Sequence, residues 1–170
     1  QRCFPLMVES DEAWREDQLL SHLEVFAEGQ FLLEKEGNIV AVASSLVVDL
    51  GHDPLRHHTY YGITDDGYFY NHEPQGDTLY GADIYVDPDC RGQGLAKILY
   101  QARRDLCRRL NLRRILCGGR LWNYAQYAEE LTPEEYVGGV QDGRIEDPVL
   151  GFQLREGFVV RGIMENYIRD

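Results

Sequence analysis

The clearest candidates for chemistry are two glycines, Gly92 and Gly94, within the stretch DPDCRGQGLAKILY (Asp87–Tyr100). Glycine weakens a helix by about 1 kcal/mol relative to alanine, so its use just before an apolar helical pattern requires a reason. A strand, a glycine-rich turn and a helix together present main-chain N–H groups and the positive end of a helix dipole to an anion. This order predicts a phosphate-binding turn, and an ordinary tight turn is the alternative.

Two common phosphate-binding motifs do not fit this stretch. A dinucleotide-binding turn requires G-x-G-x-x-G and an acidic residue about 20 positions further on. The sequence from Gly92 is G-x-G-x-A-K, and position 112 holds Leu112. The P-loop pattern G-x-x-x-x-G-K-S/T is absent, and no Ser or Thr after the turn could hold a metal for another nucleotide.

The segment Arg91–Ala96 (RGQGLA) resembles the signature Q/R-x-x-G-x-G/A of the GNAT superfamily of N-acetyltransferases. The preceding strand ends in Val-Asp-Pro, and the flanking order of elements is also similar to that family. Four segments resemble the GNAT-type domain that precedes a carbon–nitrogen hydrolase (nitrilase) domain in certain bacterial proteins: NHEPQGDTLYG, LCRRLNLRRILCGGRL, TPEEYV and DPVLGFQLREGF. This resemblance spans most of residues 1–170, and the hydrolase part is not in this chain.

The resemblance implies that acetyl-CoA, or coenzyme A, binds at the glycine turn. Its pyrophosphate would be held by the main-chain N–H groups of Arg91, Gly92, Gln93, Gly94, Leu95 and Ala96. Its pantetheine arm would lie along the main chain of Ile84, Tyr85 and Val86, as an added strand does. A side chain at either glycine would occupy the space that the phosphates need.

Transfer of an acyl group to an amine requires a neutral amine, an oxyanion stabiliser and a proton donor for the leaving thiolate. Asp83 lies where the family often keeps an acidic residue and is the candidate base, with a structural pairing to an arginine as the alternative. The family's usual acid is a tyrosine, but Gln153 stands at that position. Tyr124 is therefore the candidate acid, with Tyr127 as a substitute, and Asn123 is a candidate contact for the pantetheine.

Histidine and cysteine patterns predict no metal site. Four histidines lie in the polar segment 49–77 at spacings that match no zinc template: His52, His57, His58 and His72. The four cysteines form no C-x-x-C pair, which predicts a reducing, cytoplasmic setting with Cys107 and Cys117 in the core. The chain begins at Gln1 without a methionine, so whether the native chain extends further stays open.

Composition restricts the class of protein and its partners. The 170 residues are 44% hydrophobic and carry a net charge of −12, which predicts one globular domain that binds neither nucleic acid nor membrane. Nine of the 17 basic residues fall within 91–120, where Asp105 is the one acidic residue: Arg91, Lys97, Arg103, Arg104, Arg108, Arg109, Arg113, Arg114 and Arg120. A local site for a phosphate-bearing ligand and a solvated helix face are both consistent with this concentration.

Hydrophobic periodicity predicts the elements that hold these residues. We expect a helix over 15–28 with Leu19, Leu23 and Phe26 facing the core, a hairpin that turns near Gly37, and a strand over 78–86. A helix over 95–110 should bury one set of positions: Leu95, Ile98, Leu99, Ala102, Leu106 and Leu110. Further expected elements are a strand over 114–118, short helices near 124–130, from Thr132 and before Gly157, and a final strand.

These patterns predict a mixed α/β fold, with a GNAT-like, mostly antiparallel central sheet, helices on both faces and the family's first strand missing from the chain. Residues 1–170 should form one domain with a helical insertion at about 121–147. The predicted function is an acetyl-CoA-dependent N-acyltransferase whose acceptor, a small-molecule amine or a cationic peptide, attacks the thioester directly. A non-catalytic acyl-CoA-sensing domain associated with a carbon–nitrogen hydrolase is the alternative, and a homodimer stays open.

Overall fold

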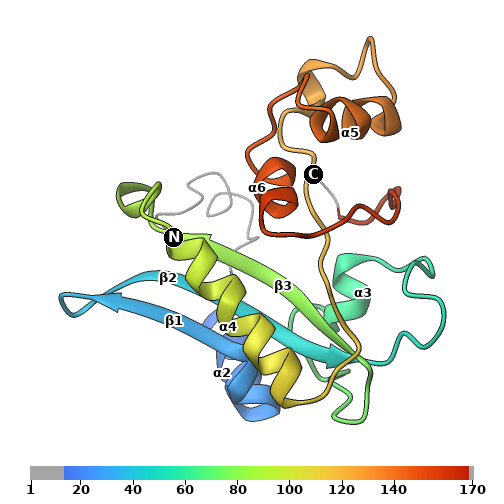
Figure 1. Cartoon of the computed structure of the whole chain (residues 1–170). Helices are drawn as coiled ribbons and strands as arrows, with labels where there is room; N and C mark the ends of the chain where they lie inside the picture. Colours follow the sequence, from blue (N-terminus) through green and yellow to red (C-terminus); the bar gives the residue numbers. More distant parts are fainter. Residues whose placement is uncertain (1–13, 169–170) are drawn as a thin grey trace. The chain divides into compact units, whose positions relative to one another are not determined.

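The computed structural model describes residues 14–168 of the chain, which form two compact units. The second unit spans Gly118–Asn166, and the other described residues make up the first (Figure 1). The predicted insertion at 121–147 falls within the second unit, and the prediction of one domain stays a prediction. The place of the family's first strand, ahead of the first described helix, lies outside the described residues.

The described part of the first unit contains a four-stranded sheet in the order β1-β2-β3-β4. Its strands are β1 (Gln30–Lys35), β2 (Asn38–Val48), β3 (Thr78–Val86) and β4 (Arg114–Leu116). The first three pair antiparallel, and β4 pairs parallel to β3. The β1–β2 turn at Glu36 and Gly37 has φ of 53° and 77°, as a tight hairpin requires. The expected hairpin and the mostly antiparallel sheet are therefore confirmed.

Helices cover both faces of this sheet, as expected (Figure 1). They are α2 (Glu16–Phe26), α3 (Tyr60–Thr64) and α4 (Leu95–Arg109), with short 3-10 turns η1 (Ala27–Gly29) and η2 (Pro88–Cys90). Leu99 of α4 packs against Ala41 and Ala43 of β2 on one face. Trp14 and Val25, before and within α2, belong to the apolar cluster on the other face.

The orientation predicted for α2 is wrong. Leu19, Leu20 and Leu23 are 46%, 54% and 56% exposed, and of the predicted core residues only Phe26 is buried. The cause is the segment 65–69, which contains several left-handed residues and turns its carbonyls toward α2. Polar side chains of α2 donate to these carbonyls: Gln18 to Asp66 (2.8 Å), Ser21 to Tyr68 (2.6 Å) and His22 to Gly67 (2.7 Å). These hydrogen bonds turn the polar side of α2 toward the loop and leave its leucines exposed.

The buried side of α4 also differs from the predicted one. Ile98 is 51% exposed, whereas Arg103, which the hydrophobic pattern left out of the core, is 1% exposed. The fully buried positions of the helix are Leu99, Tyr100, Arg103, Leu106 and Cys107. Cys107 is thus a core residue, as predicted, and burial raises the pKa of its thiol.

The second unit is built from η3 (Tyr124–Gln126), α5 (Pro133–Gln141) and α6 (Leu150–Arg155). The predicted capping box at the start of α5 is present, because Thr132 Oγ1 accepts from the Glu135 N–H and Glu135 Oε2 accepts from the Thr132 N–H. The expected short helix over 124–130 is reduced to the single turn η3. The expected final strand is wrong: Val160 and Ile163 pack against the Tyr136 cluster instead of entering a ladder.

No helix within residues 14–168 combines the length and the apolar character that crossing a bilayer demands.

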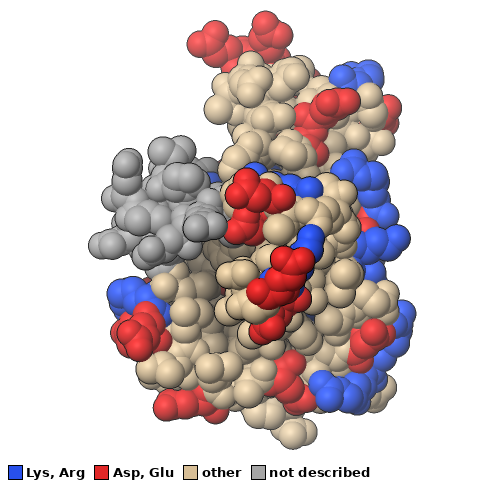
Figure 2. Space-filling view, turned by 90° about the vertical axis from the view of Figure 1, so that its left-hand side faces the viewer, with Lys and Arg blue, Asp and Glu red and all other residues tan. Residues whose placement is uncertain are grey.

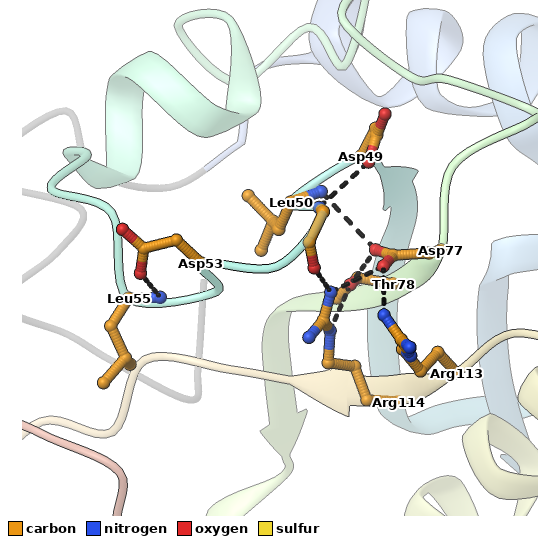
Figure 3. A network of polar contacts seen from close by, with 9 residues as sticks. Asp49, Leu50, Asp53, Leu55, Asp77, Thr78, Arg113 and Arg114 are labelled. Atoms are coloured by element: carbon orange, nitrogen blue, oxygen red, sulfur yellow. Dashed lines mark hydrogen bonds and ion pairs between the residues drawn. The ribbon is translucent and has the colours of Figure 1, made fainter.

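A network of polar contacts joins the starts of β3 and β4 at Asp77 (Figure 3). Arg114 Nη2 donates to Asp77 Oδ2 (2.6 Å) and to the Gly51 carbonyl (2.6 Å), while Nε donates to Thr78 Oγ1 (2.7 Å). Burial alone would raise the pKa of Asp77, but hydrogen bonds from Thr78 and Arg114 outweigh it and lower the pKa. The network therefore stabilises the fold above the unfolded carboxyl pKa, and this stabilisation is lost as the pH falls below about 4.

We expect Asp77→Asn to lower the free energy of unfolding by about 2 kcal/mol at neutral pH, because half-buried Arg114 loses its counter-charge. Urea unfolding at neutral pH measures this loss. Asp142→Asn is the matched control, since its ion pair with Arg144 has side chains 65% and 69% exposed, and it should cost at most about 0.5 kcal/mol. Equal losses in the two variants would contradict a stabilising network at Asp77.

His22 makes the stability dependent on pH. Its side chain is 1% exposed and stacks on Phe69 at a centroid distance of 3.7 Å, and Nδ1 has no hydrogen-bond partner within the described part of the chain. Burial lowers the pKa of His22, so the native state keeps it neutral, whereas an unfolded histidine titrates near about 6.5. Below that pH the unfolded chain binds a proton at His22 but the native state does not. The free energy of unfolding therefore decreases as the pH falls.

His72 contributes in the same direction, because burial lowers the pKa of its imidazole as well. We therefore expect His22→Gln to flatten, but not abolish, the loss of stability between about pH 7.5 and about pH 5.5, which can reach about 1.4 kcal/mol per pH unit for each such histidine. Urea unfolding at both pH values measures this. An unchanged slope in His22→Gln would show that His22 does not titrate on unfolding.

Candidate functional site

The turn between β3 and α4 has the backbone that the glycines predicted. Asp87 opens it, its side chain accepting from the Asp89 N–H (2.9 Å), and η2 follows. Gly92 and Gly94 have φ of 75° and 78°, in the left-handed region that residues other than glycine rarely adopt. Gly94 is the N-cap of α4, and no side chain caps this helix. The first turn of the helix is therefore left without an internal acceptor for its donors.

Consecutive N–H groups in this turn have no protein acceptor within residues 14–168. They belong to Gly92, Gln93, Gly94, Leu95 and Ala96. A Cβ placed on Gly92 or Gly94 would meet no atom of the described residues within 4 Å, so packing among them does not account for either glycine. Donors that converge on open space at the start of a 15-residue helix form an anion-binding arrangement.

The basic residues near this turn have divided roles. Lys35 Nζ, from the end of β1, donates to Gln93 Oε1 (3.4 Å), and Lys97 lies on the exposed first turn of α4. Other members of the basic segment 91–120 form ion pairs with acidic side chains: Arg108 with Asp105, Arg109 with Glu28, and Arg114 with Asp77. On the face shown in Figure 2, basic side chains lie next to acidic ones rather than forming an unbroken patch. The segment is thus partly structural.

The main chain of β3 is open along its second half. β4 pairs with β3 over Thr78–Tyr80 alone, so no described strand flanks the later residues of β3 on the side away from β2. The Asp87 N–H donates to the Val40 carbonyl (2.8 Å), and bonded and non-bonded pairs alternate along an antiparallel ladder. The peptide groups of Ile84 and Val86 therefore point away from β2, where an extended ligand could add as a strand.

A β-bulge separates the two halves of β3. Ser44 pairs with Asp83 and Ser45 pairs with Gly81, so one residue of β3 is extra. The Asp83 carboxylate accepts from the Ser44 N–H (2.9 Å) and from the indole N–H of Trp14. The described donors to the Asp83 carboxylate are therefore a main-chain N–H and an indole, whereas the alternative pairing was with an arginine side chain.

The candidate acid and its neighbour lie in the second unit, whereas Asp83 lies in the first. The Tyr124 hydroxyl donates to the Leu131 carbonyl (3.1 Å), and its ring contacts Tyr136. Asn123 donates from its main chain to Asp147 (3.2 Å) and from Nδ2 to the Glu146 carbonyl (3.0 Å). Both predicted residues are thus engaged within their own unit.

Gln153, which replaces the usual tyrosine, is buried in α6. A Cβ on Gly119 would lie 2.3 Å from Gln153 Oε1, so the glutamine side chain packs directly on the chain at Gly119. The position therefore has a packing role within the second unit. Of the two predicted core thiols, Cys117 is half-buried, and burial raises its pKa to about 11.

Sequence reasoning missed two buried residues beside the site, Arg103 and His22. Both are polar residues inside helices whose apolar residues suggested a different orientation. In each helix the buried residues three or four positions away share one face with the missed residue. A prediction that counts only hydrophobic residues overlooks such a polar position. The histidines of segment 49–77 form no cluster with Cys, Asp or Glu that could hold a metal among the described residues.

The sequence profile described as the acetyltransferase (GNAT) family matches residues 1–128. The chain belongs to this family. Two proteins of Bacillus subtilis (strain 168) are similar to it. The uncharacterized N-acetyltransferase YkwB is 39% identical over 170 residues, which cover 100% of this chain and 75% of YkwB. The probable hydrolase YhcX is 48% identical over 168 residues, or 99% of this chain and 32% of YhcX, so the chain spans about a third of that relative.

Solved structures share the fold. The GNAT-like decarboxylase GphF, in complex with isobutyryl-CoA, is 24% identical with a TM-score of 0.75 and covers 98% of this chain and 81% of GphF. The loading GNATL domain of CurA from Lyngbya majuscula is 21% identical with a TM-score of 0.70 and covers 89% of this chain and 77% of that domain. These likenesses confirm the predicted GNAT-like fold. The enzyme class, a GNAT-type N-acetyltransferase, rests on the family match and on YkwB.

Proposed function

We propose that this chain transfers an acyl group, with acetyl-CoA as the donor, to the amine of a small molecule or a cationic peptide. The observation that carries the proposal is the run of N–H groups at Gly92–Ala96, which has no acceptor among the described residues and opens α4 beside the open edge of β3. The chain offers one donor set for a diphosphate and a second set for an extended arm. Those are the two recognition elements of coenzyme A.

The residues fit this ligand without rearrangement. The predicted Arg91 donor is corrected, because the Arg91 N–H donates to the Pro88 carbonyl (3.3 Å). The N–H groups at 92–96 would hold the pyrophosphate, with Lys97 and Lys35 as nearby positive charges, and the peptide groups of Ile84 and Val86 would hold the pantetheine. Acetyl-CoA, when bound, supplies a thioester carbonyl and a thiolate leaving group. The Ile84 N–H is a main-chain donor suited to an oxyanion, because it points away from β2.

Asp83 is the candidate general base. Its carboxylate is fixed by Ser44 and Trp14, next to the Ile84 peptide, and could take a proton from the attacking amine directly or through a water. Tyr124 stays a candidate acid for the thiolate. The net charge of −12 favours a cationic acceptor, because an acidic surface concentrates cations.

The two relatives from Bacillus subtilis help to choose between an acyltransferase and a non-catalytic acyl-CoA-sensing domain. The match to YkwB covers the full length of this chain and 75% of YkwB. Because YkwB is named an N-acetyltransferase, the match supports an enzyme over a sensing domain. The match to about a third of YhcX, which is named a probable hydrolase, is consistent with association with a hydrolase domain, and we propose a carbon–nitrogen hydrolase as that domain. Cys90, Cys107 and Cys117 form no disulfide with one another, which is consistent with the cytoplasmic location that we propose.

Titration with coenzyme A, followed by calorimetry and thermal unfolding, tests the proposal. A ligand present at about 100 times its Kd should add about 2.7 kcal/mol to the stability of the native state. Release of free thiol from acetyl-CoA over a library of amines then separates an enzyme from a sensing domain. Absence of binding at millimolar coenzyme A would contradict both functions, and binding without turnover would favour the sensing domain.

A further inference from the structure

The most unusual buried group of the first unit is the guanidinium of Arg103. Arg103 lies in the middle of α4 and is 1% exposed. Its Cζ and Nη1 would stand 3.1 Å from a Cβ on Gly81, so glycine at that position leaves the space that the guanidinium fills. The arginine therefore reaches from α4 into the bulge of β3.

Three donor contacts hold the guanidinium in the bulge. Nη2 donates to the Ser44 carbonyl (2.7 Å) and to the Asp83 carbonyl, and Nε donates to Ser45 Oγ (3.0 Å). No carboxylate of the described residues forms an ion pair with it. A buried charge without a counter-ion is costly, and here the hydrogen bonds to these three acceptors offset part of that cost.

The contacts replace the ladder where β2 and β3 separate. In a regular antiparallel ladder the main-chain groups of Ser44 and Asp83 would bond each other, because this is a bonded pair in the alternation set by Val40 and Asp87. Here the Ser44 N–H donates to the Asp83 side chain instead, and Arg103 takes both carbonyls. The bulge is thus stabilised by a side chain from α4.

The same contacts fix the groups that the proposed function uses. The Asp83 carbonyl and the Ile84 N–H belong to one peptide group, so a cation that donates to the carbonyl polarises the N–H on the open side. The Asp83 carboxylate is also held in place, because it accepts from the Ser44 N–H (2.9 Å) at the same bulge. One buried cation therefore orients both the candidate base and the candidate oxyanion donor.

We propose that Arg103 is a positioning residue for acyl transfer, which acts through the Asp83–Ile84 peptide and contacts neither the acyl donor nor the acceptor. This inference rests on the proposed function. The pyrophosphate donors at Gly92–Ala96 make no contact with Arg103, so loss of its guanidinium should affect carbonyl polarisation and turnover much more than binding of coenzyme A.

Arg103→Lys tests the inference, because it keeps the charge and removes the planar fork of donors. The readouts are the coenzyme A affinity, the infrared carbonyl band of isotope-labelled acetyl-CoA bound to the protein, and thiol release. We expect an affinity within about threefold of wild type, loss of most of the band shift caused by binding, and a rate lowered about tenfold or more. Arg108→Met, a surface arginine of the same helix whose side chain is 69% exposed, is the control and should leave all three unchanged.

Gly81→Ala is the second variant and keeps the inference testable if Arg103→Lys does not fold. Its methyl group would displace the guanidinium by a few tenths of an ångström without removing its charge. We expect a smaller change in the same band and a smaller loss of rate, with coenzyme A affinity retained.

The outcomes separate this inference from the function on which it rests. If the wild-type protein binds no coenzyme A, both fail. If it binds and Arg103→Lys leaves the carbonyl band and the rate as in wild type, the role of Arg103 alone is overturned. A parallel fall of affinity, band shift and rate in Arg103→Lys would likewise overturn it, since that pattern is the one of a structural residue.

Discussion

Gly94→Val should lower the affinity for coenzyme A by about 100-fold or more while the protein stays folded. A side chain at Gly94 would enter the space beside the N–H groups of Gly92–Ala96, where no atom of residues 14–168 lies within 4 Å of the position of a Cβ. Isothermal titration with coenzyme A measures the affinity, and circular dichroism reports the fold.

The control for this variant must carry the same backbone strain. Gly143 has φ of 74° and open space around its Cβ position, as Gly94 does, but it follows α5 in the second unit. Gly94→Val and Gly143→Val should each cost about 1–2 kcal/mol of stability for the left-handed backbone. Only Gly94→Val should lose coenzyme A. Equal affinities in the two variants would show that the diphosphate binds elsewhere.

Asp83→Asn should lower the rate of acyl transfer by about 100-fold or more, because the amide cannot accept the proton of the amine. The Asn side chain keeps an oxygen for the Ser44 N–H, and its amide would face the indole N–H of Trp14. Affinity for coenzyme A should change little, since the phosphate donors are on a different segment. Single-turnover kinetics with acetyl-CoA and an accepted amine measure the rate.

Asp105→Asn is the matched control, as an exposed carboxylate of α4 that pairs with Arg108. It should leave the rate within about twofold of wild type. A wild-type rate in Asp83→Asn would remove Asp83 as the base and leave its carboxylate with the structural contacts to Ser44 and Trp14. Comparison with Arg103→Lys then shows whether the polarised peptide acts without the carboxylate.

Local sequence patterns were sufficient to predict the strand and the turns that surround the candidate site. The strand at 78–86, the hairpin turn at Gly37 and the capping box at Thr132 depend on patterns within a few residues, and the structure contains all three. The glycines at 92 and 94 likewise predicted a turn before a helix, and both have the left-handed backbone that few other residues adopt. Family membership followed from the same segment.

Contacts between distant segments decided the rest. The leucines of α2 face outward because the carbonyls of Asp66, Gly67 and Tyr68 require donors, and that demand arises from a loop more than 40 positions away in the chain. Arg103 is buried because a bulge between β2 and β3 exposes two carbonyls inside the sheet. Hydrophobic periodicity ranks side chains by their own polarity, whereas burial depends on which polar groups the surrounding chain leaves unsatisfied. The sequence alone therefore determined the turn that would bind a diphosphate, and the tertiary structure decided which side chains hold the candidate base in place.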